Sequence, residues 1–525
     1  MKIQFTFFLA LMAAIILLIM VAKKIKIAYP VLLVVAGLLI SLIPGIPLIP
    51  IDPELVFIIF LPPLLFDAAW SISWKELWRW RRVIFSFAFV VVFLTACSVA
   101  FVANAFIPGF SLPLGFLLGA IVSPPDAVSV GAILKFVKVP KRMASMLEGE
   151  SLLNDASSLI IFRFAFIAVA TGQFVWQEAA LSFVWMVLGG AGAGLIVGWV
   201  FMKAHKYLPT DANMDIILSI ISPYVMYMAA EEIHSSGVLG VVCGGLLLSY
   251  KRHYYLNSTS RLRGINFWSS LSFVLNGLVF TLIGLDLPVI VSGLGGVSIV
   301  SAIGYGVLIT GVLIVGRILA AYGAVGFTLI ARNFITVADS RNPGWKAPLL
   351  MGWSGMRGVV SLAAALSIPV QLSANTAFPQ RNLILFITFV VILLTLLIQG
   401  LTLPFLIRKI KLPDRNADLP DDEKSLLIRQ QLAAFSLQYL SNNYKDALAT
   451  YPILQQMAEK WQDHSSTATD KIEMAADCKA VYRDILNEQR KWLLKKNKQE
   501  KELNEEIIRK HLSQLDLEEE KLRFA

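Results

Sequence analysis

The chain has 525 residues, of which 57% are hydrophobic and only 16% carry a charge. Such a balance is not normal for a water-soluble globular protein of this length, so we expect the chain to lie in a membrane. The net charge of +10 does not indicate nucleic-acid binding, because the basic residues lie in short connections between apolar runs. The three cysteines, two in apolar runs and one in the polar tail, do not suggest a disulfide framework.

Apolar runs of about 20 residues, the length of helix that crosses the hydrocarbon core of a membrane, recur along the chain. The first run lacks the basic start and the cleavage site of a signal peptide, so we expect it to remain as a membrane helix. We predict about thirteen spans, with about twelve as the alternative because the ninth is short and the eleventh is long. Their approximate limits are 3–22, 27–48, 53–72, 83–107, 112–137, 143–171, 176–202, 212–234, 236–250, 266–287, 296–331, 347–369 and 381–408.

Lysines and arginines are concentrated in alternate connections between these spans. Residues such as Lys23, Arg81, Lys141 and Lys206 lie in one set of connections, whereas connections such as 108–111 have almost none. Because cytoplasmic connections hold the excess of basic residues, this alternation predicts a multi-pass protein of the plasma (inner) membrane. With an odd number of spans, the N-terminus lies outside and the C-terminal tail lies in the cytoplasm.

The character of the sequence changes after Leu412. Residues 413–525 are polar, charged and poor in glycine, which predicts a cytosolic helical domain behind a transmembrane domain of residues 1–412. From 480 to 524, apolar residues recur at loosely helical spacing among lysines and glutamates. This pattern is typical of a solvated structural helix, and a regulatory or oligomer contact is the alternative. The sequence does not identify a partner for this tail.

Several ionisable side chains fall inside the spans, where each costs at least about 2.5 to 3.5 kcal/mol and is therefore a functional hypothesis. Counting about 1.5 Å per residue from the start of each span places Asp67 and Asp126 about 21 Å from the outer side. The same count places Asp155 and Arg357 about 17 Å from the inner side. Because all these depths fall near the middle of the membrane, we predict one shared polar site rather than unrelated ion pairs.

Two of the spans that carry these residues are also interrupted. Residues 123–126 place two prolines in mid-span, where a helix loses hydrogen bonds and must kink or unwind. Residues 351–358 interrupt another span with glycines. If spans one to six and eight to thirteen are two inverted six-helix repeats, each interruption falls in the fifth member of its repeat. Interrupted helices at corresponding positions indicate the midplane site of a transporter, and an ordinary proline kink is the alternative.

The sixth span brings several oxygen-bearing side chains to neighbouring faces of one helix. Helical spacing of four stacks Ser151 on Asp155, and Glu150 on Asn154. Oxygen ligands suit a hard cation, so we predict that Asp155, Ser151 and Asp67 bind Na+ together with carbonyls of the interrupted fifth span. The buried carboxylate can take a proton instead, so Na+ and H+ compete for one charge and are exchanged. The neutral Asn154 favours one proton per Na+ and hence electroneutral exchange.

Glu150 needs a partner at its depth, and Arg357 is the candidate for a buried structural ion pair between the sixth and twelfth spans. Arg317 and Glu231 lie away from the midplane by the same depth count. Packing pairs are one interpretation of these two residues and their neighbours. A cation-attracting funnel around residues 231–234 is the other interpretation.

At these residues the sequence resembles the electroneutral Na+/H+ exchanger family that bacteria and animals share. The resemblance covers essentially all the spans and depends on the joint occurrence of several motifs. These are residues 61–67, the segment around Asp126, residues 149–156, residues 231–237, Asn276 with Phe280 and Gly284, residues 356–358 and residues 399–404.

The resemblance implies a homodimer with a dimerisation part and a mobile core, interrupted helices crossed inside the core, and elevator-like alternating access. It also implies a role for each matching residue: Asp155 as the ion-binding carboxylate, Ser151 and Asp67 as supporting ligands, Asn154 as the neutral neighbour, Asp126 at the helix crossing, and Glu150 with Arg357 as paired charges. Asp67 stands where many members have glutamate, and Pro125 stands where threonine is usual. These departures leave the ligand set open, and with it the choice between Na+, K+ and Li+.

Two rival functions belong to other classes. Residues 352–355 superficially fit the nucleophile motif of an intramembrane serine protease, but no histidine that could act as its base follows Ser354 within a span. A cation channel, or a membrane sensor that signals through the tail, is the second rival. A channel needs a continuous pore, whereas paired interrupted helices with buried carboxylates suit alternating access. We therefore predict an antiporter rather than an enzyme, with Na+ and H+ as transported ions, no cofactor, no nucleic acid, and membrane lipids around it.

Overall fold

The structure is a computed structural model and describes residues 2–25, 27–43, 53–134, 137, 139–172, 176–294, 297–331, 344–373, 376–410, 421–462, 476–500 and 503–524. Within these residues the chain is almost wholly helical, as the sequence predicts. The described strands are β1 (Gln371–Ser373) and β2 (Thr376–Ala377), which form one short antiparallel pair.

Seven helical stretches in the described residues are long and apolar enough to cross a membrane. They are Trp74–Phe106, Lys141–Thr171, Ala180–Tyr207, Ala212–Glu232, Ser258–Ser292, Ile299–Ile330 and Arg381–Ile410. Shorter apolar helices occupy Tyr29–Ser41, Ile58–Ser71 and Leu112–Val122. The chain is therefore a mostly helical membrane protein. The count of about thirteen spans and their arrangement as inverted repeats stay predictions.

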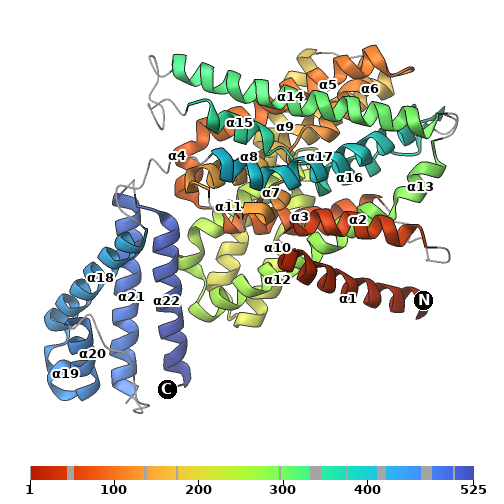
Figure 1. Cartoon of the computed structure of the whole chain (residues 1–525). Coiled ribbons are helices and arrows are strands. Elements are labelled where there is room, and N and C mark those ends of the chain that lie inside the picture. The colour runs from red at the N-terminus through yellow and green to blue at the C-terminus, as the bar shows by residue number, and fades with distance from the viewer. Residues whose placement is uncertain are drawn as a thin grey trace. The chain divides into compact units, whose positions relative to one another are not determined.

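Each predicted span coincides with a helix or with an interrupted pair of helices in the described residues (Figure 1). Up to residue 410 the elements are α1 (Lys2–Ile25), α2 (Tyr29–Ser41), α3 (Pro53–Ser71), α4 (Trp74–Phe85), the π-helical segment η1 (Ser86–Val91), α5 (Val92–Phe106), α6 (Leu112–Val122), α7 (Ala127–Leu134), α8 (Lys141–Thr171), α9 (Trp176–Tyr207), α10 (Ala212–Glu232), α11 (Gly237–Tyr255), α12 (Ser258–Leu285), α13 (Leu287–Ser292), α14 (Ile299–Ala331), α15 (Lys346–Trp353), α16 (Val359–Leu366) and α17 (Arg381–Ile410).

Both interruptions that the sequence predicts are confirmed. α6 ends at Val122 and α7 begins at Ala127, with the two prolines between them. α15 ends at Trp353 and α16 begins at Val359, with two glycines between them. Proline has no N–H with which to continue a helix, and glycine favours other backbone conformations. Each interruption therefore leaves backbone groups that must find partners outside their own helix.

α8 carries most of the candidate site and runs without interruption for 31 residues. No proline breaks it between its first and last turns. It ends where Gly172 adopts a left-handed conformation with φ of 67°, which stops a helix. Its buried polar side chains are Glu150, Ser151, Asn154, Asp155, Ser157 and Ser158. A long uninterrupted helix with a polar buried face is thus available to line a site.

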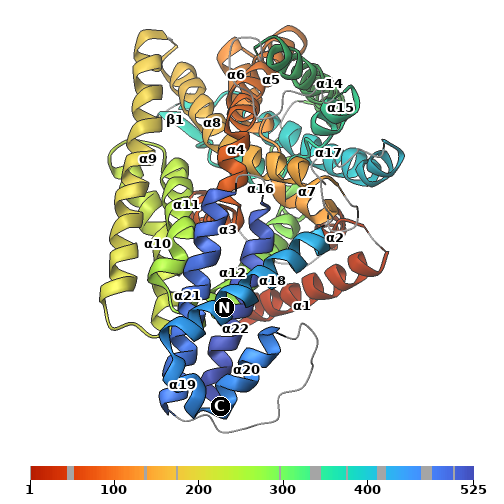
Figure 2. The ribbon, with the colours of Figure 1, turned by 90° about the vertical axis from the view of Figure 1, so that its left-hand side faces the viewer.

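Close packing of the helices depends on small residues. Gly115 of α6 lies directly against the backbone of Ala100 of α5. A side chain at this glycine would collide with that backbone, so the close approach of the two helices requires its absence. In the same way, α9 and α11 lie side by side where Gly194 meets Gly240 (Figure 2).

The chain divides into two compact units. The membrane unit comprises Met1–Leu208, Ile217–Lys251 and Trp268–Pro413, and the tail unit comprises Pro209–Ile216, Arg252–Phe267 and Asp414–Ala525. The tail unit thus contains two connections between membrane helices besides the C-terminal region. The predicted domain boundary between residues 412 and 413 lies outside the described residues and stays a prediction.

The C-terminal part of the tail unit is a helical bundle. Its helices are α18 (Asp421–Asn443), α19 (Lys445–Thr450), α20 (Pro452–Gln462), α21 (Ala476–Gln499) and α22 (Glu505–Phe524). In Figure 1, α18, α21 and α22 lie side by side. Buried apolar residues such as Ile428, Leu486 and Leu512 form a core among them. The helical apolar spacing after residue 480 therefore serves packing inside the tail unit.

Candidate functional site

The two interruptions meet. The backbone N–H of Asp126, at the end of the first interruption, donates a hydrogen bond of 2.8 Å to the carbonyl of Met356 in the second. Segments far apart in the sequence thus satisfy backbone groups that each broken helix leaves without an internal partner. The prediction that the two interruptions lie together is confirmed.

Asp126 also begins α7. Its Oδ2 atom accepts hydrogen bonds from the Ser129 hydroxyl at 2.5 Å and from the Ser129 N–H at 3.2 Å. This is the arrangement of an N-terminal helix cap, which satisfies a free N–H of the first turn. The half-buried carboxylate at the meeting point is therefore held in place by the helix that it caps.

α8 packs against the first interruption at the carbonyl of Pro125. The Asn154 amide donates a hydrogen bond to this oxygen at 3.0 Å, and the Ser151 hydroxyl donates to it at 3.3 Å. All three residues are buried. The Oδ1 atom of Asn154 has no hydrogen-bond partner among the described residues. The structure thus brings together four of the predicted site residues, counting Asp126 next to Pro125.

Asp155 follows Asn154 on α8 and is 8% exposed. Asp126 is close enough to act on it electrostatically. No residue in the described part of the chain donates a hydrogen bond to the Asp155 carboxylate. Because a bare charge buried without a donor is costly, this carboxylate requires a proton or a cation.

Asp67 lies on α3, which packs against α8 and α16. Its side chain is half-buried and lies beside Ser272 of α12. The neighbouring Phe66 ring packs on the Trp268 ring of α12, with 4.8 Å between the ring centroids. None of the described contacts links Asp67 to Asp155, so its role as an ion ligand stays a prediction.

The ion pair predicted between Glu150 and Arg357 is wrong. Glu150 instead pairs with Arg317 of α14, with 2.6 Å between Oε1 and a guanidinium nitrogen. The two side chains are 1% and 2% exposed. The depth count placed Arg317 away from the site, and this placement is wrong. The count assumes that a helix starts at the membrane surface. α14 has 33 residues, more than a span needs, so the assumption fails.

Arg357 has a different function in the fold. Its guanidinium group donates hydrogen bonds to the carbonyls of Val122 and Gly355. Val122 is the last residue of α6, and Gly355 follows the end of α15. The last carbonyls of a helix have no internal partner and carry partial negative charge, so Arg357 satisfies the end of α6 and, in addition, a carbonyl inside the second interruption. Its own N–H donates to the Thr395 hydroxyl of α17 at 3.2 Å.

The charged side chains near the meeting point of the two interruptions do not balance one another. The carboxylates of Glu150, Asp126 and Asp155 lie there with the guanidinium groups of Arg317 and Arg357. If every group is ionised, one negative charge is left over among these residues. One proton or one monovalent cation restores neutrality, which lowers the cost of burial.

Glu231 lies away from this cluster and is exposed. Its Oε1 atom accepts a hydrogen bond of 3.1 Å from the N–H of Gly237, the first residue of α11. Glu231 and Arg163 both act electrostatically on Tyr227. These contacts fit the packing interpretation, and the cation-attracting funnel stays a prediction.

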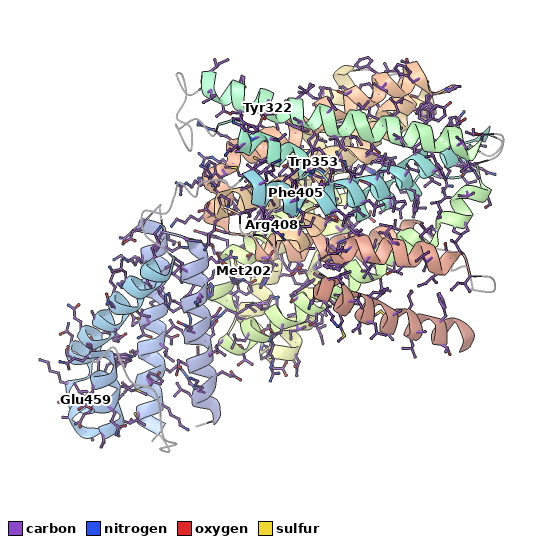
Figure 3. All side chains as sticks on the ribbon, in the orientation of Figure 1. Met202, Tyr322, Trp353, Phe405, Arg408 and Glu459 are labelled. Carbon is purple, nitrogen blue, oxygen red and sulfur yellow. The ribbon has the colours of Figure 1, made fainter. Side chains whose placement is uncertain are left out.

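α15, the first half of the second broken helix, is fixed to its neighbours by aromatic side chains. Figure 3 labels Trp353 of α15, whose indole N–H donates to the Thr402 hydroxyl of α17 at 2.9 Å. The hydroxyl of Tyr322, on α14, donates to the carbonyl of Trp345 at 2.8 Å. The broken helix therefore has partners on two long apolar helices.

Sequence reasoning missed three contributors to this arrangement: Ser129, Thr395 and the pairing role of Arg317. Hydroxyl residues are frequent in membrane helices and often bond to their own helix, so the sequence has no signal that marks the first two. A buried arginine inside an apolar helix is a stronger signal, because it must have a partner. The identity of that partner, Glu150 of α8, follows only from the folded structure.

A profile of the family described as "Sodium/hydrogen exchanger, transmembrane" matches residues 9–409. The chain belongs to the sodium/hydrogen exchanger family. The matched region includes every residue of the site described above. The resemblance seen in the sequence motifs is thereby confirmed.

Several relatives in this family are named as cation/proton antiporters, so they are transporters rather than enzymes. A sodium, potassium, lithium and rubidium/H+ antiporter of Bacillus subtilis is 35% identical over 396 residues, covering 72% of this chain and 57% of the relative. The chain thus spans under three fifths of the length of such Bacillus relatives. The Na+/H+ antiporter ApNhaP of Aphanothece halophytica is 35% identical over 392 residues, covering 74% of this chain and 70% of the relative.

One relative matches the tail as well. A protein of Mycobacterium tuberculosis, named as an uncharacterised Na+/H+ exchanger, is 31% identical over 530 residues. This match covers 98% of the present chain and 95% of the relative. The similarity therefore extends through the tail unit and is not confined to the membrane helices.

The fold is similar to a solved structure of the sodium proton antiporter MjNhaP1 from Methanocaldococcus jannaschii. The TM-score is 0.60 at 19% sequence identity, and the match covers 77% of this chain and 98% of that chain. At this identity the similarity concerns the fold alone. It agrees with the helical membrane architecture described above.

Proposed function

We propose that the chain is a secondary antiporter that exchanges Na+ for H+ across the plasma membrane, with both ions competing for Asp155. The observation that carries the proposal is the burial of the Asp155 carboxylate, to which none of the described residues donates a hydrogen bond, next to the meeting point of two interrupted helices. A carboxylate in this position has low free energy only when a proton or a cation neutralises it. Exchange follows if only one of them fits at a time.

The groups around Asp155 have the chemistry that Na+ requires. A hard cation binds to carboxylate, hydroxyl and carbonyl oxygens. The Ser151 hydroxyl and the Pro125 carbonyl are neighbours within 3.3 Å of each other, and Asp126 acts on Asp155 from the same interruption. We assign these groups to the Na+ site, with Asp67 as a further proposed ligand. Asn154 positions the Pro125 carbonyl through its amide.

We propose electroneutral exchange of one Na+ for one H+. The support is the charge balance where the two interruptions meet, because three carboxylates and two guanidinium groups leave one negative charge when Asp67 is protonated in both loaded states. Either ion alone cancels that charge, so both loaded states are neutral. The unloaded state carries a buried charge and is therefore disfavoured during the crossing of the membrane.

The mode of movement is proposed as elevator-like alternating access in a homodimer, with the N-terminus outside and the tail unit in the cytoplasm. The bonds of Asp126 to Met356 and of Arg357 to Val122 tie both broken helices together, which favours their movement as one body. The alternation of basic connections supports the orientation. The ion remains open between Na+, Li+ and K+, because the name of the Bacillus subtilis relative includes sodium, potassium and lithium.

Purified protein in proteoliposomes with an enclosed pH dye tests the proposal. A pulse of Na+ should move protons in the opposite direction, and Asp155→Asn should abolish this response while the protein stays folded. Glu500→Gln, which changes an exposed carboxylate of the tail, should keep the wild-type response. Near-normal Na+-driven proton flux in folded Asp155→Asn would refute the assignment. Parallel pulses of Li+ and K+ identify the other transported ions.

A cation channel, or a membrane sensor that signals through the tail, is the alternative function. The feature that favours it is the compact tail unit, which includes connections between membrane helices. A channel carries an Na+ current without obligatory proton movement. A sensor carries neither ion, so the same flux measurement separates all three functions.

A further inference from the structure

The tail unit holds the connection between α11 and α12 through a buried ion-pair junction. Arg261, near the start of α12, donates through Nε to Oδ2 of Asp516 at 3.0 Å and through a second nitrogen to Oδ1. Arg490 of α21 donates to the same carboxylate at 2.9 Å and to Glu519 at 2.9 Å. The side chains of Arg261 and Asp516 are 5% and 4% exposed. One carboxylate of α22 therefore joins α21 to the start of a membrane helix.

Two further hydrogen bonds fasten the same region. The Thr259 hydroxyl of α12 donates to Glu520 of α22 at 2.7 Å. The Ser260 hydroxyl donates to Asp215, in the first turn of α10, at 2.6 Å. The starts of α10 and α12 and the C-terminal helix are thus parts of one compact unit. Because α10 and α12 continue along the chain as apolar helices, movement of this unit is transmitted to them covalently.

A half-buried histidine lies near this junction. His253 is on the last turn of α11, beyond the predicted span, and its Nδ1 atom has no hydrogen-bond partner among the described residues. Four helices contribute the charged groups that act on His253: Arg252 of α11, Arg261 of α12, Arg490 of α21 and Arg509 of α22. Glu505 of α22 acts on the adjacent Arg252. Burial, reinforced by the arginines, holds the pKa of His253 well below its usual value, so the ring is neutral near pH 7.

We propose that the junction of Asp516 with Arg261 and Arg490 is a latch that holds the C-terminal helices on the starts of α10 and α12, and that protonation of His253 releases it. A protonated imidazole adds a positive charge among arginines whose carboxylate partners are already engaged. Arg261 and Arg490 share Asp516, and Arg509 pairs with Glu505 at 3.2 Å. No carboxylate among these is left to accept the new charge, so protonation weakens the junction.

The direction of the pH effect follows from proton linkage. In the released state the histidine meets water and titrates near its ordinary value of about 6.5, whereas in the latched state it titrates lower. Between these two values the released state binds more protons. Acid therefore favours release, and the latched state gains stability as the pH rises toward neutrality. With the proposed orientation of the chain, the signal is cytoplasmic acid, and its effect on ion exchange rests on the proposed antiport.

Hydrogen exchange followed by mass spectrometry on the full-length protein tests the latch directly, without any measurement of transport. The backbone amides of 252–263 and of α22 should be protected near pH 7.5 and should lose about tenfold of that protection near pH 5.5, after correction for intrinsic exchange, because pH 5.5 lies about one unit below the ordinary histidine pKa of about 6.5. Asp516→Asn should lack this protection at both pH values. His253→Gln, which stays neutral, should keep it at both. Lys521→Gln removes an exposed ion pair of the same helix and should behave as wild type.

Arg261→Gln removes the other side of the junction and decides the question if Asp516→Asn does not fold. Equal protection of α22 at both pH values in wild type overturns the latch, as does acid release that persists in His253→Gln.

Transport in proteoliposomes tests whether the latch affects ion exchange. Near pH 7.5 the Na+-driven proton flux of Asp516→Asn should differ several-fold from that of wild type. Near pH 5.5 the two fluxes should become equal. Equal fluxes of Asp516→Asn and wild type at both pH values overturn the coupling of the latch to transport. Absence of flux in wild type refutes the proposed function, and the hydrogen-exchange result then decides the latch alone.

Discussion

Asp126 and Gly358 fit against each other where the two broken helices cross, because the Asp126 carboxylate occupies the space that any other residue at position 358 would fill with its side chain. A Cβ atom built on Gly358 would collide with Oδ2, Cγ and Cβ of Asp126. Gly358 is also the residue directly before α16. The absence of a side chain at this position therefore permits the contact between the two interruptions.

The first prediction concerns this contact. Gly358→Ala should lower stability by about 1 to 3 kcal/mol, because the added methyl group overpacks a buried position and displaces Asp126. It should also reduce exchange, since Asp126 acts on Asp155. A lower melting temperature together with reduced proton flux in proteoliposomes is the expected result. Gly311→Ala on α14 is the matched control, because nothing lies within 4 Å of its added Cβ atom. Equal melting temperatures of wild type and Gly358→Ala would contradict the prediction.

The positions of both interruptions could be predicted from the sequence, because a proline pair and a cluster of glycines inside apolar runs have direct effects on the backbone. Their mutual contact could be expected only from the matching position in two repeats. The fit of Asp126 against Gly358 could not be expected at all, since it depends on the angle between the two chains. The sequence therefore predicts which segments form the site better than it predicts their contacts.

The second prediction concerns the ion pair of Glu150 with Arg317. Arg317→Met should lower stability by about 3 to 5 kcal/mol, because it leaves the Glu150 carboxylate buried without its partner. A large fall in the melting temperature and in the yield of folded protein is the expected observation. Lys203→Met on α9 is the control. The described contacts of the Lys203 ammonium group are with the aromatic rings of Trp199 and Tyr207, so its removal leaves no carboxylate without a partner.

A double variant makes this prediction specific. Glu150→Gln combined with Arg317→Met removes both charges, so it should be more stable than Arg317→Met alone. The order of melting temperatures should be wild type, double variant, single variant. A double variant that is less stable than Arg317→Met would show that the two side chains do not depend on each other.

The third prediction concerns Arg357, which bonds to the carbonyls of Val122 and Gly355. Arg357→Met leaves two buried carbonyls without donors, at a cost of about 1 to 3 kcal/mol for each. The loss of folded protein should therefore exceed the loss of Na+ affinity in the protein that folds. The melting temperature with and without Na+ measures both effects. A variant of normal yield that is no longer stabilised by Na+ would place Arg357 in the ion site instead.

The partners in long-range ion pairs are harder to predict from the sequence than the positions of the helices. Arg261 and Asp516 are 255 positions apart, and the polar tail offers many other acidic residues as partners. Counting residues along each helix placed Arg357 at the depth of Glu150 and Arg317 away from the midplane, so it favoured Arg357. The count ignores where a long helix such as α14 enters the membrane. Only the contact between Arg317 of α14 and Glu150 of α8 in the folded protein decides between the two arginines.

The last prediction concerns Asn154, whose amide donates to the Pro125 carbonyl at 3.0 Å. An aspartate at this position can donate to that oxygen only when it is protonated, and its charged form would repel the carbonyl. Asn154→Asp should therefore bind a second proton in the proton-loaded state and release it when Na+ enters. Exchange by this variant should move net charge, and a voltage-sensitive dye in proteoliposomes should respond to an Na+ pulse. Wild type should give no such response. Asn154→Ser keeps a neutral hydrogen-bond donor and should also give no dye response. A response in that variant would show that charge movement does not depend on a charged side chain at position 154.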